Sequence, residues 1–190
     1  DPCMGSGHIL VYIFDVLMQI YSACGYTTRE AVASIVENNL WGLDIDERAA
    51  QLAYFSVMMK ARQYDRRFLT RDIVPHVYAI HESNALGGAY QYDMGDFLNS
   101  KEYQGTLNYL LDAFVDAKEY GSILQLEDRD YEGLKKAWDE QAEATADTVN
   151  LSLWQWAVAS EIPHLIDQAI ALSKKYHIIV TNPPYMKSAS

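Results

Sequence analysis

A β-branched apolar run within residues 177–181 is followed directly by Asn182, Pro183, Pro184 and Tyr185. Such a run is typical of a buried strand, and proline cannot donate a hydrogen bond to a neighbouring strand. The sequence therefore predicts a strand over residues 177–181 that holds Asn182 at its carboxyl end. Open α/β sheets bind their ligands at the carboxyl ends of the strands, so this corner is the first candidate site.

The residues at this corner suit a planar amine. The Asn182 side-chain oxygen and the Pro183 carbonyl can together accept two hydrogen bonds from one NH2 group. The Tyr185 ring offers a face on which a planar base can stack. The alternative is a plain Pro-Pro loop after a core strand, since a motif of four letters also occurs by accident.

A glycine-containing turn opens the chain. Gly5 and Gly7 precede a helical pattern over residues 8–24, which places a turn without side chains at a helix N-terminus. No Gly-Lys-Ser/Thr follows and the third glycine of a dinucleotide fingerprint is missing, so this is not a phosphate loop. Asp1, ahead of the glycines, instead suits a ligand that carries a cationic amine.

Two acids lie at the end of a second predicted strand, at residues 40–44. Asp44 stands at the strand end, where nucleotide-binding α/β sheets hydrogen-bond ribose hydroxyls. Asp46 precedes a helical run over residues 47–63, and we expect it to be the N-cap of that helix rather than a ligand residue. Ile45, between the two acids, can pack on an adenine face.

A third strand is predicted over residues 76–80, and two acids after it compete for one role. Glu82 follows this strand directly, whereas Asp96 follows a weaker strand pattern. Strand geometry favours Glu82. Either acid can also be a turn or cap residue only.

Together these motifs resemble the S-adenosylmethionine-dependent methyltransferases that methylate adenine N6 in DNA. Asp-Pro-x-x-Gly-Ser-Gly resembles their motif I, Gly-Leu-Asp-Ile-Asp their motif II, and Asn-Pro-Pro-Tyr their catalytic motif IV, in the order of the gamma class. More narrowly, residues 48–62 and 116–122 resemble the large methyltransferases of bacteriophage-exclusion or restriction-modification systems.

The resemblance implies a cofactor, a partner and a set of site residues. The cofactor is S-adenosyl-L-methionine, and the partner of the full-length enzyme is double-stranded DNA, with other defence-system subunits as further partners. Catalysis is assigned to Asn182, Pro183, Pro184 and Tyr185, which would hold a flipped adenine. Cofactor binding is assigned to Asp1 for the ammonium, Gly5 and Gly7 for close backbone approach, Asp44 for the ribose, Ile45 for the adenine, and Glu82 or Asp96 as the motif III acid.

The expected fold class is α/β, a partial Rossmann-like methyltransferase sheet with a long, mainly helical insert. Residues 1–84 would form the cofactor-binding part, 85–175 the insert, and 176–190 the catalytic strand and loop. Within the insert, helices are predicted at residues 107–118, 131–143 and 162–175, with Trp138, Trp154 and Trp156 in a small core. We expect the chain to be a fragment, without the strand that delivers Asp1, and inactive in isolation.

Composition sets further limits. The 190 residues are 49% hydrophobic with a formal net charge of −11, which fits one good core and argues against DNA binding by this piece alone. One basic cluster, interleaved with Tyr64 and Phe68, either meets phosphates or is a solvated helix end. It comprises Lys60, Arg62, Arg66, Arg67 and Arg71.

The remaining features indicate a cytoplasmic protein without a metal site. The helix at residues 8–24 belongs to a core and is not a membrane span or signal peptide. Cys3 and Cys24 lack metal-ligand spacing and are expected to be small buried hydrophobes in a reducing compartment. The five histidines form no metal-binding pattern.

Two other function classes remain open at this point. Asn-Pro-Pro-Tyr also serves enzymes that methylate glutamine side-chain amides or guanine N2 in RNA, because both present a planar nitrogen to the same acceptors. The non-enzymatic alternative is a cofactor-binding or scaffold module whose insert recruits a partner.

Overall fold

The computed structural model describes residues 1–86, 98–145 and 153–183. The chain divides into two compact units. The first comprises residues 1–79 together with the segment that begins at Tyr176, and the second comprises residues 80–175. Among the described residues, no helix is both long and apolar enough to cross a bilayer.

The first unit contains two parallel strands, β1 (Trp41–Asp44) and β2 (His76–Ala79), with Trp41 opposite His76 and Asp44 opposite Ala79. The Trp41 and His76 rings stack with centroids 3.8 Å apart, a cross-strand contact that helps to fix this register. The predicted strands at residues 40–44 and 76–80 are therefore confirmed. The α/β class is shown by this sheet, although helix predominates.

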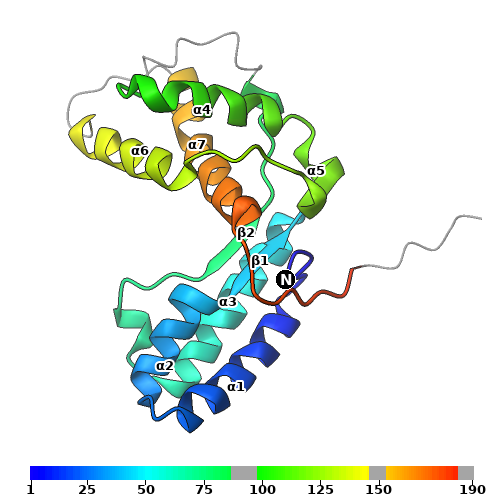
Figure 1. Ribbon diagram of the computed structural model, residues 1–190, viewed down its shortest axis with the longest axis vertical. Helices are drawn as coiled ribbons and strands as arrows, with labels where there is room; N and C mark the ends of the chain where they lie inside the picture. Colours follow the sequence, from blue (N-terminus) through cyan, green and yellow to red (C-terminus); the bar gives the residue numbers. More distant parts are fainter. Residues whose placement is uncertain (87–97, 146–152, 184–190) are drawn as a thin grey trace, which may run out of the picture. The chain divides into compact units, whose positions relative to one another are not determined.

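Three helices accompany the strands in this unit: α1 (His8–Ala23), α2 (Thr28–Ser34) and α3 (Glu47–Tyr64) (Figure 1). One turn of π-helix, Ile35–Asn39, continues α2. The predicted helices at residues 8–24 and 47–63 are confirmed. The helix α2 is not among the predicted elements, although Thr27 and Glu30 form the capping box that signals a helix start.

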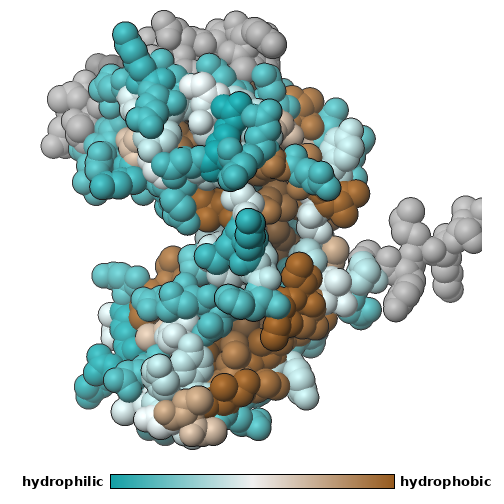
Figure 2. Space-filling view, viewed as in Figure 1, coloured by the Kyte–Doolittle hydropathy of each residue, from teal (hydrophilic) through white to brown (hydrophobic). Residues whose placement is uncertain are grey.

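The helices cover the sheet because each buries one apolar face. α3 packs against α1 and both strands. Its buried face carries small side chains, among them Ala53 and Ala61, which are fully buried. Small residues let the α3 backbone approach its neighbours closely. Other apolar side chains of α1 and α3 remain exposed, and apolar surface gathers on the α1 side of this unit (Figure 2).

Residues 1–4 lie along the free edge of β1. The Leu43 N–H donates to the Asp1 carbonyl at 3.0 Å, and the Met4 N–H donates to the Leu43 carbonyl at 3.0 Å. These bonds fasten the opening segment beside β1, on the edge opposite β2. The glycine turn that follows therefore lies next to the carboxyl end of β1.

The predicted strand at residues 177–181 is wrong. That segment has no regular secondary structure, and Ile178 and Ile179 are 79% and 67% exposed. Both edges of β1 are already occupied, one by β2 and the other by residues 1–4. A β-branched run without a ladder partner does not form a strand by itself.

The described part of the second unit is helical, with α4 (Lys101–Ala113), α5 (Ala117–Tyr120), α6 (Tyr131–Thr145) and α7 (Leu153–Ser173). The predicted helix at 131–143 is confirmed. The one predicted at 107–118 is interrupted after Ala113, where Asp116 adopts a left-handed conformation with φ 53°. The one predicted at 162–175 begins upstream, at Leu153, with Pro163 inside it.

The second unit has its own apolar core where α4, α6 and α7 pack together. Leu107, Leu134 and Leu165 are fully buried, and Trp138 is buried as predicted. The side chains of Trp154 and Trp156 lie outside the described residues.

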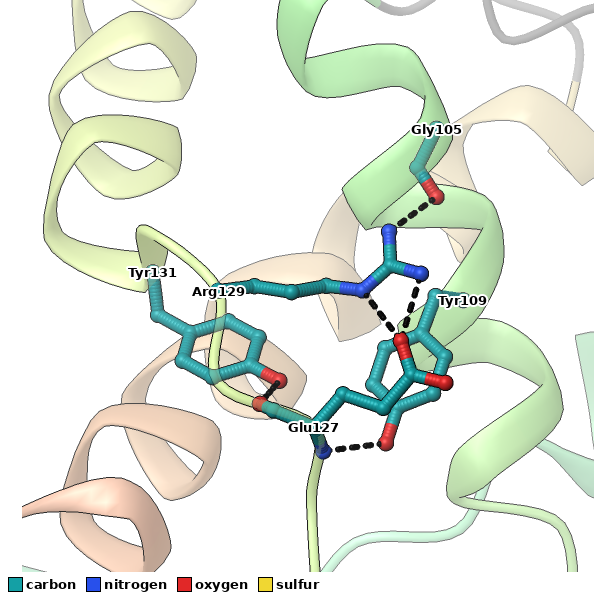
Figure 3. Close-up of polar contacts among 5 residues, drawn as sticks. All are labelled: Gly105, Tyr109, Glu127, Arg129 and Tyr131. Atoms are coloured by element: carbon teal, nitrogen blue, oxygen red, sulfur yellow. Dashed lines mark hydrogen bonds and ion pairs between the residues drawn. The ribbon is translucent and has the colours of Figure 1, made fainter.

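A polar cluster fastens the segment before α6 to α4 (Figure 3). The Arg129 guanidinium lies 4.4 Å from the centre of the Tyr109 ring and donates to the Glu127 carboxylate at 2.7 and 2.9 Å. The Tyr131 hydroxyl donates to the Glu127 carbonyl at 2.7 Å. Burial raises the pKa of Tyr131 to about 12, so the hydroxyl keeps its proton at neutral pH.

Candidate functional site

The candidate site is built on the glycine turn between residues 1–4 and α1. Gly5 has φ 53° and Gly7 has φ 84°, the left-handed region that favours glycine. The Gly7 N–H donates to the Met4 carbonyl at 2.9 Å, and Gly7 is the N-cap of α1. The backbone of this turn is thereby held beside the carboxyl end of β1.

The two glycines differ in what surrounds them. A Cβ on Gly7 would lie 2.9 Å from both Cα and Cβ of Ala53, so Gly7 permits the close contact between the turn and α3. A Cβ on Gly5 would meet nothing within 4 Å. The space over Gly5 is therefore open to a ligand.

We predict that Gly7→Ala destabilises the chain more than Gly5→Ala. Both changes place alanine at positive φ, which costs about 1–2 kcal/mol, but only Gly7→Ala adds an overpacked contact of about 1–3 kcal/mol. Urea unfolding of the two variants measures the difference. Equal losses of stability would contradict the close contact between Gly7 and Ala53.

Asp44 fastens the turn to the end of β1. Its Oδ2 accepts a hydrogen bond from the Gly5 N–H at 2.8 Å, and its Oδ1 accepts one from the Asp46 N–H at 2.9 Å. The side chain is half-buried. Each carboxylate oxygen can accept a further bond, so Asp44 can bind a hydroxyl group while it organises the turn.

Asp46 has the structural role that the sequence predicts. Its Oδ1 accepts hydrogen bonds from the Arg48 N–H at 2.8 Å and the Ala49 N–H at 3.4 Å, so it is the N-cap of α3. The interpretation of Asp46 as a cap is confirmed. Ile45, between the two acids, is 52% exposed, so its apolar side chain is accessible to a ligand.

Asp1 has one carboxylate oxygen in use and one that is not. Its Oδ1 accepts a hydrogen bond from the Cys3 N–H at 3.0 Å. Its Oδ2 is buried and has no hydrogen-bond partner among residues 1–86, 98–145 and 153–183. A buried acceptor without a partner costs about 1–3 kcal/mol, and a cationic group on a ligand would remove that cost.

Sequence reasoning did not single out Ser6 and His8 as site residues. The Ser6 hydroxyl lies 2.8 Å from His8 Nδ1, at the surface of the turn. Both residues line a shallow hollow between α1 and α3, which Val11, Leu52 and other α3 residues complete. The sequence signal for Ser6 as a site residue is its position between Gly5 and Gly7 on the turn.

Glu82 lies in the second unit and acts there as a capping residue. Its Oε1 accepts a hydrogen bond from the Lys118 N–H at 3.0 Å, at the start of α5. Its neighbour Asn84 holds Asp116 through two bonds, of 2.6 and 2.8 Å. Asp96, the competing motif III candidate, lies outside the described residues.

The predicted catalytic corner is only partly described. Asn182 and Pro183 are exposed and belong to the first unit, in a segment without regular secondary structure. Pro184 and Tyr185 lie outside the described residues. The assignment of these four residues stays a prediction.

The expectation that both cysteines are buried is wrong. Cys24 is exposed and Cys3 is half-buried. Cys24 follows directly after α1, at the C-cap, where the chain turns at the surface towards Gly25. The surface turn after α1 therefore exposes Cys24 despite the hydrophobic character of cysteine.

Comparison with known proteins gives strong matches. The chain is 40% identical to an adenine-specific methyltransferase PglX of Lacticaseibacillus casei (strain Zhang) over 99% of this chain and 15% of that protein. It is 38% identical to an adenine-specific methyltransferase BrxX of Escherichia coli O9:H4 (strain HS), over 98% of this chain and 17% of that protein.

A shorter match covers 28% of the chain, at 39% identity, and 5% of a putative type II restriction enzyme and methyltransferase of Methanocaldococcus jannaschii. The chain thus spans less than a fifth of the length of the curated relatives it matches. Residues 38–190, most of the chain, match the family described as Eco57I restriction-modification methylase. The expected resemblance is confirmed, and the chain belongs to the Eco57I restriction-modification methylase family.

Proposed function

We propose that the full-length protein transfers a methyl group from S-adenosyl-L-methionine to the N6 amine of adenine in DNA. One observation carries the cofactor part of this proposal: the buried Asp1 Oδ2 without a partner, beside a glycine turn that Asp44 holds in place. A carboxylate oxygen that lacks a partner, next to an open, hydrogen-bonded turn, suits a ligand with both an ammonium and hydroxyl groups.

The residues of the turn fit the cofactor group by group. Asp1 would bind the ammonium of the methionine part. The open space over Gly5 would admit the cofactor atoms that lie against the backbone of the turn. Asp44 would accept from the ribose hydroxyls, and the exposed Ile45 side chain would pack on the adenine ring. Glu82 or Asp96 remains the proposed motif III acid.

The predicted catalytic corner, residues 182–185, would bind the substrate adenine. Asn182 Oδ1 and the Pro183 carbonyl would accept the two N6 hydrogens, which orients the nitrogen lone pair, and Tyr185 would stack on the flipped base after Pro184. S-adenosylmethionine, when bound, supplies the electrophilic methyl group. The chain's own contribution is positioning and electrostatics, without a covalent bond to any side chain.

In this proposal the parts of the chain have distinct tasks. Residues 1–84 form the cofactor-binding part of a Rossmann-like methyltransferase domain, residues 85–175 a mainly helical insert, and residues 176–190 the catalytic segment. The parent protein would act on double-stranded DNA in the cytoplasm, with other defence-system subunits as partners. The names of the two long relatives support adenine over a glutamine amide or RNA guanine as the acceptor.

The reaction product tests this proposal. The full-length protein is incubated with S-adenosylmethionine that carries a deuterated methyl group and with duplex DNA of mixed sequence, and the DNA is digested to nucleosides for mass spectrometry. We expect labelled N6-methyldeoxyadenosine. RNA and a glutamine-containing peptide are the control acceptors, and label in either of these but not in DNA would contradict the proposal.

A further inference from the structure

Three arginines at the carboxyl end of α3 are exposed: Arg62 on the last turn of the helix, and Arg66 and Arg67 in the turn that follows. Within the described ranges 1–86, 98–145 and 153–183, none of their guanidinium groups has an acidic partner within 4.0 Å. These three residues are called the α3 arginine cluster. Solvated guanidinium groups without partners are ready donors to anionic oxygens.

The other two basic residues of this region are already paired. Lys60 Nζ lies 2.7 Å from Asp15 Oδ2, and Arg71 forms an ion pair with Asp65. These pairs neutralise Asp15 and Asp65, and Asp72 is then the one exposed acid within ten residues of the cluster in the sequence. Within residues 60–72, the charges outside these two pairs therefore sum to a positive value.

The aromatic residues between the arginines have structural roles. The Tyr64 hydroxyl donates to Asp15 Oδ1 at 2.6 Å, its ring stacks on Phe14 with centroids 5.9 Å apart, and Phe68 is fully buried. Phe68 cannot stack on a base, and Phe14 already covers one face of the Tyr64 ring. The cluster therefore offers charge without a stacking ring, which favours a phosphate backbone over unstacked bases.

The net charge of the chain does not oppose this role. Nearly all of the net negative charge belongs to residues 80–175, and the first unit carries almost equal numbers of acidic and basic residues. In the first unit, the arginine cluster can thus dominate the local field. At 0.15 M salt the field of more distant charges is screened within about 8 Å.

The position of the cluster separates it from the candidate cofactor site. α3 begins beside Asp44 and runs for 18 residues, which at 1.5 Å per residue is about 27 Å. The α3 arginine cluster stands at the far end of this helix. That length equals about eight base pairs of a DNA duplex, at about 3.4 Å each.

We propose that the α3 arginine cluster is an auxiliary, sequence-independent contact to DNA phosphates, remote from the candidate cofactor site. This inference rests on the proposed function, since it assumes that the full-length protein engages a duplex. Each arginine would neutralise about one phosphate. A duplex that extends well beyond the methylated base would be bound more tightly than a short one.

The test is the salt dependence of DNA binding by the full-length protein. Binding of a labelled duplex of mixed sequence is followed by fluorescence anisotropy over a range of salt concentrations, with the wild type and an Arg62→Gln/Arg66→Gln/Arg67→Gln variant. A plot of log K against log salt concentration has a negative slope. Loss of three phosphate contacts should make this slope less steep by about 2.7. Affinity at low salt should fall roughly tenfold or more.

Two further variants keep the test sharp. Replacing the same three arginines by lysine retains the charge and should restore most of the slope. Replacing Lys101, Lys118 and Lys136 by glutamine removes equal charge from exposed sites of the second unit and should leave the slope as in wild type. An unchanged slope in the arginine-to-glutamine variant would overturn the proposal.

The outcome is distinct from that of the methylation experiment. Methyl transfer to a duplex too short to reach the cluster should be the same for the wild type and the arginine-to-glutamine variant. Absence of DNA methylation by the wild type would contradict the proposed function, whereas an unchanged salt slope would contradict only the phosphate contact.

Discussion

Replacing Asn182 by alanine is expected to abolish methyl transfer by the full-length protein and to leave S-adenosylmethionine binding intact. The Asn182 amide oxygen is proposed to touch only the substrate amine, so its loss removes an acceptor at the reacting nitrogen and nothing from the cofactor. Removing one such positioned polar group typically costs 10²- to 10³-fold in rate, about 2.7–4 kcal/mol. Single-turnover methylation measures the rate, and calorimetric titration measures cofactor affinity.

Thr181 provides the matched control, since it is the adjacent exposed residue of the same irregular segment. Thr181→Ala should retain nearly full activity. A separate change, Tyr185→Ala, should weaken capture of the flipped base by about 1–3 kcal/mol. Wild-type turnover by Asn182→Ala would remove Asn182 from the proposed reaction, and lost cofactor affinity would show that it acts on the fold of the site.

Replacing Asp44 by alanine is expected to weaken S-adenosylmethionine binding by about 1–3 kcal/mol, because buried ribose hydroxyls would lose their acceptor. The structure adds a second reason. The Gly5 and Asp46 N–H groups both donate to this carboxylate, so the glycine turn would also lose the bonds that hold it on β1. Calorimetry on the full-length protein measures the affinity, and urea unfolding measures the stability.

Asp46→Ala separates the two consequences of the Asp44 change. It removes the N-cap of α3, which costs about 1 kcal/mol of stability, but it leaves Asp44 and its bond to Gly5 in place. We expect Asp46→Ala to bind the cofactor as the wild type does. Equal cofactor affinity in Asp44→Ala and wild type would leave Asp44 with a structural role only.

Local sequence patterns predict the elements that adjoin the glycine turn. The strand that ends at Asp44, the cap at Asp46 and the helix after Gly7 each depend on a few neighbouring residues, and all three are present. The carboxylate of Asp44 and the N–H of Gly5 are 39 positions apart in sequence. Their hydrogen bond depends on parallel alignment of residues 1–4 with β1, which no local pattern encodes.

Long-range pairing also explains the wrong prediction of a strand. Residues 177–181 have the composition of a strand, but a strand forms only beside a free edge, and β2 and residues 1–4 take the two edges of β1. Glu82 follows a real strand, and its bond to the Lys118 N–H is likewise a long-range contact, while its assignment as the motif III acid stays a prediction. Propensity and motif order could not show these partners.

Methylation-sensitive sequencing of genomic DNA tests the central claim most directly. Cells that produce the full-length wild-type protein are compared with cells that produce the Asn182→Ala variant at the same level. We predict N6-methyladenine at a defined sequence motif in the first and its loss in the second. An adenine methylome that is the same in both would contradict the account and would favour a glutamine amide or RNA guanine as the methyl acceptor.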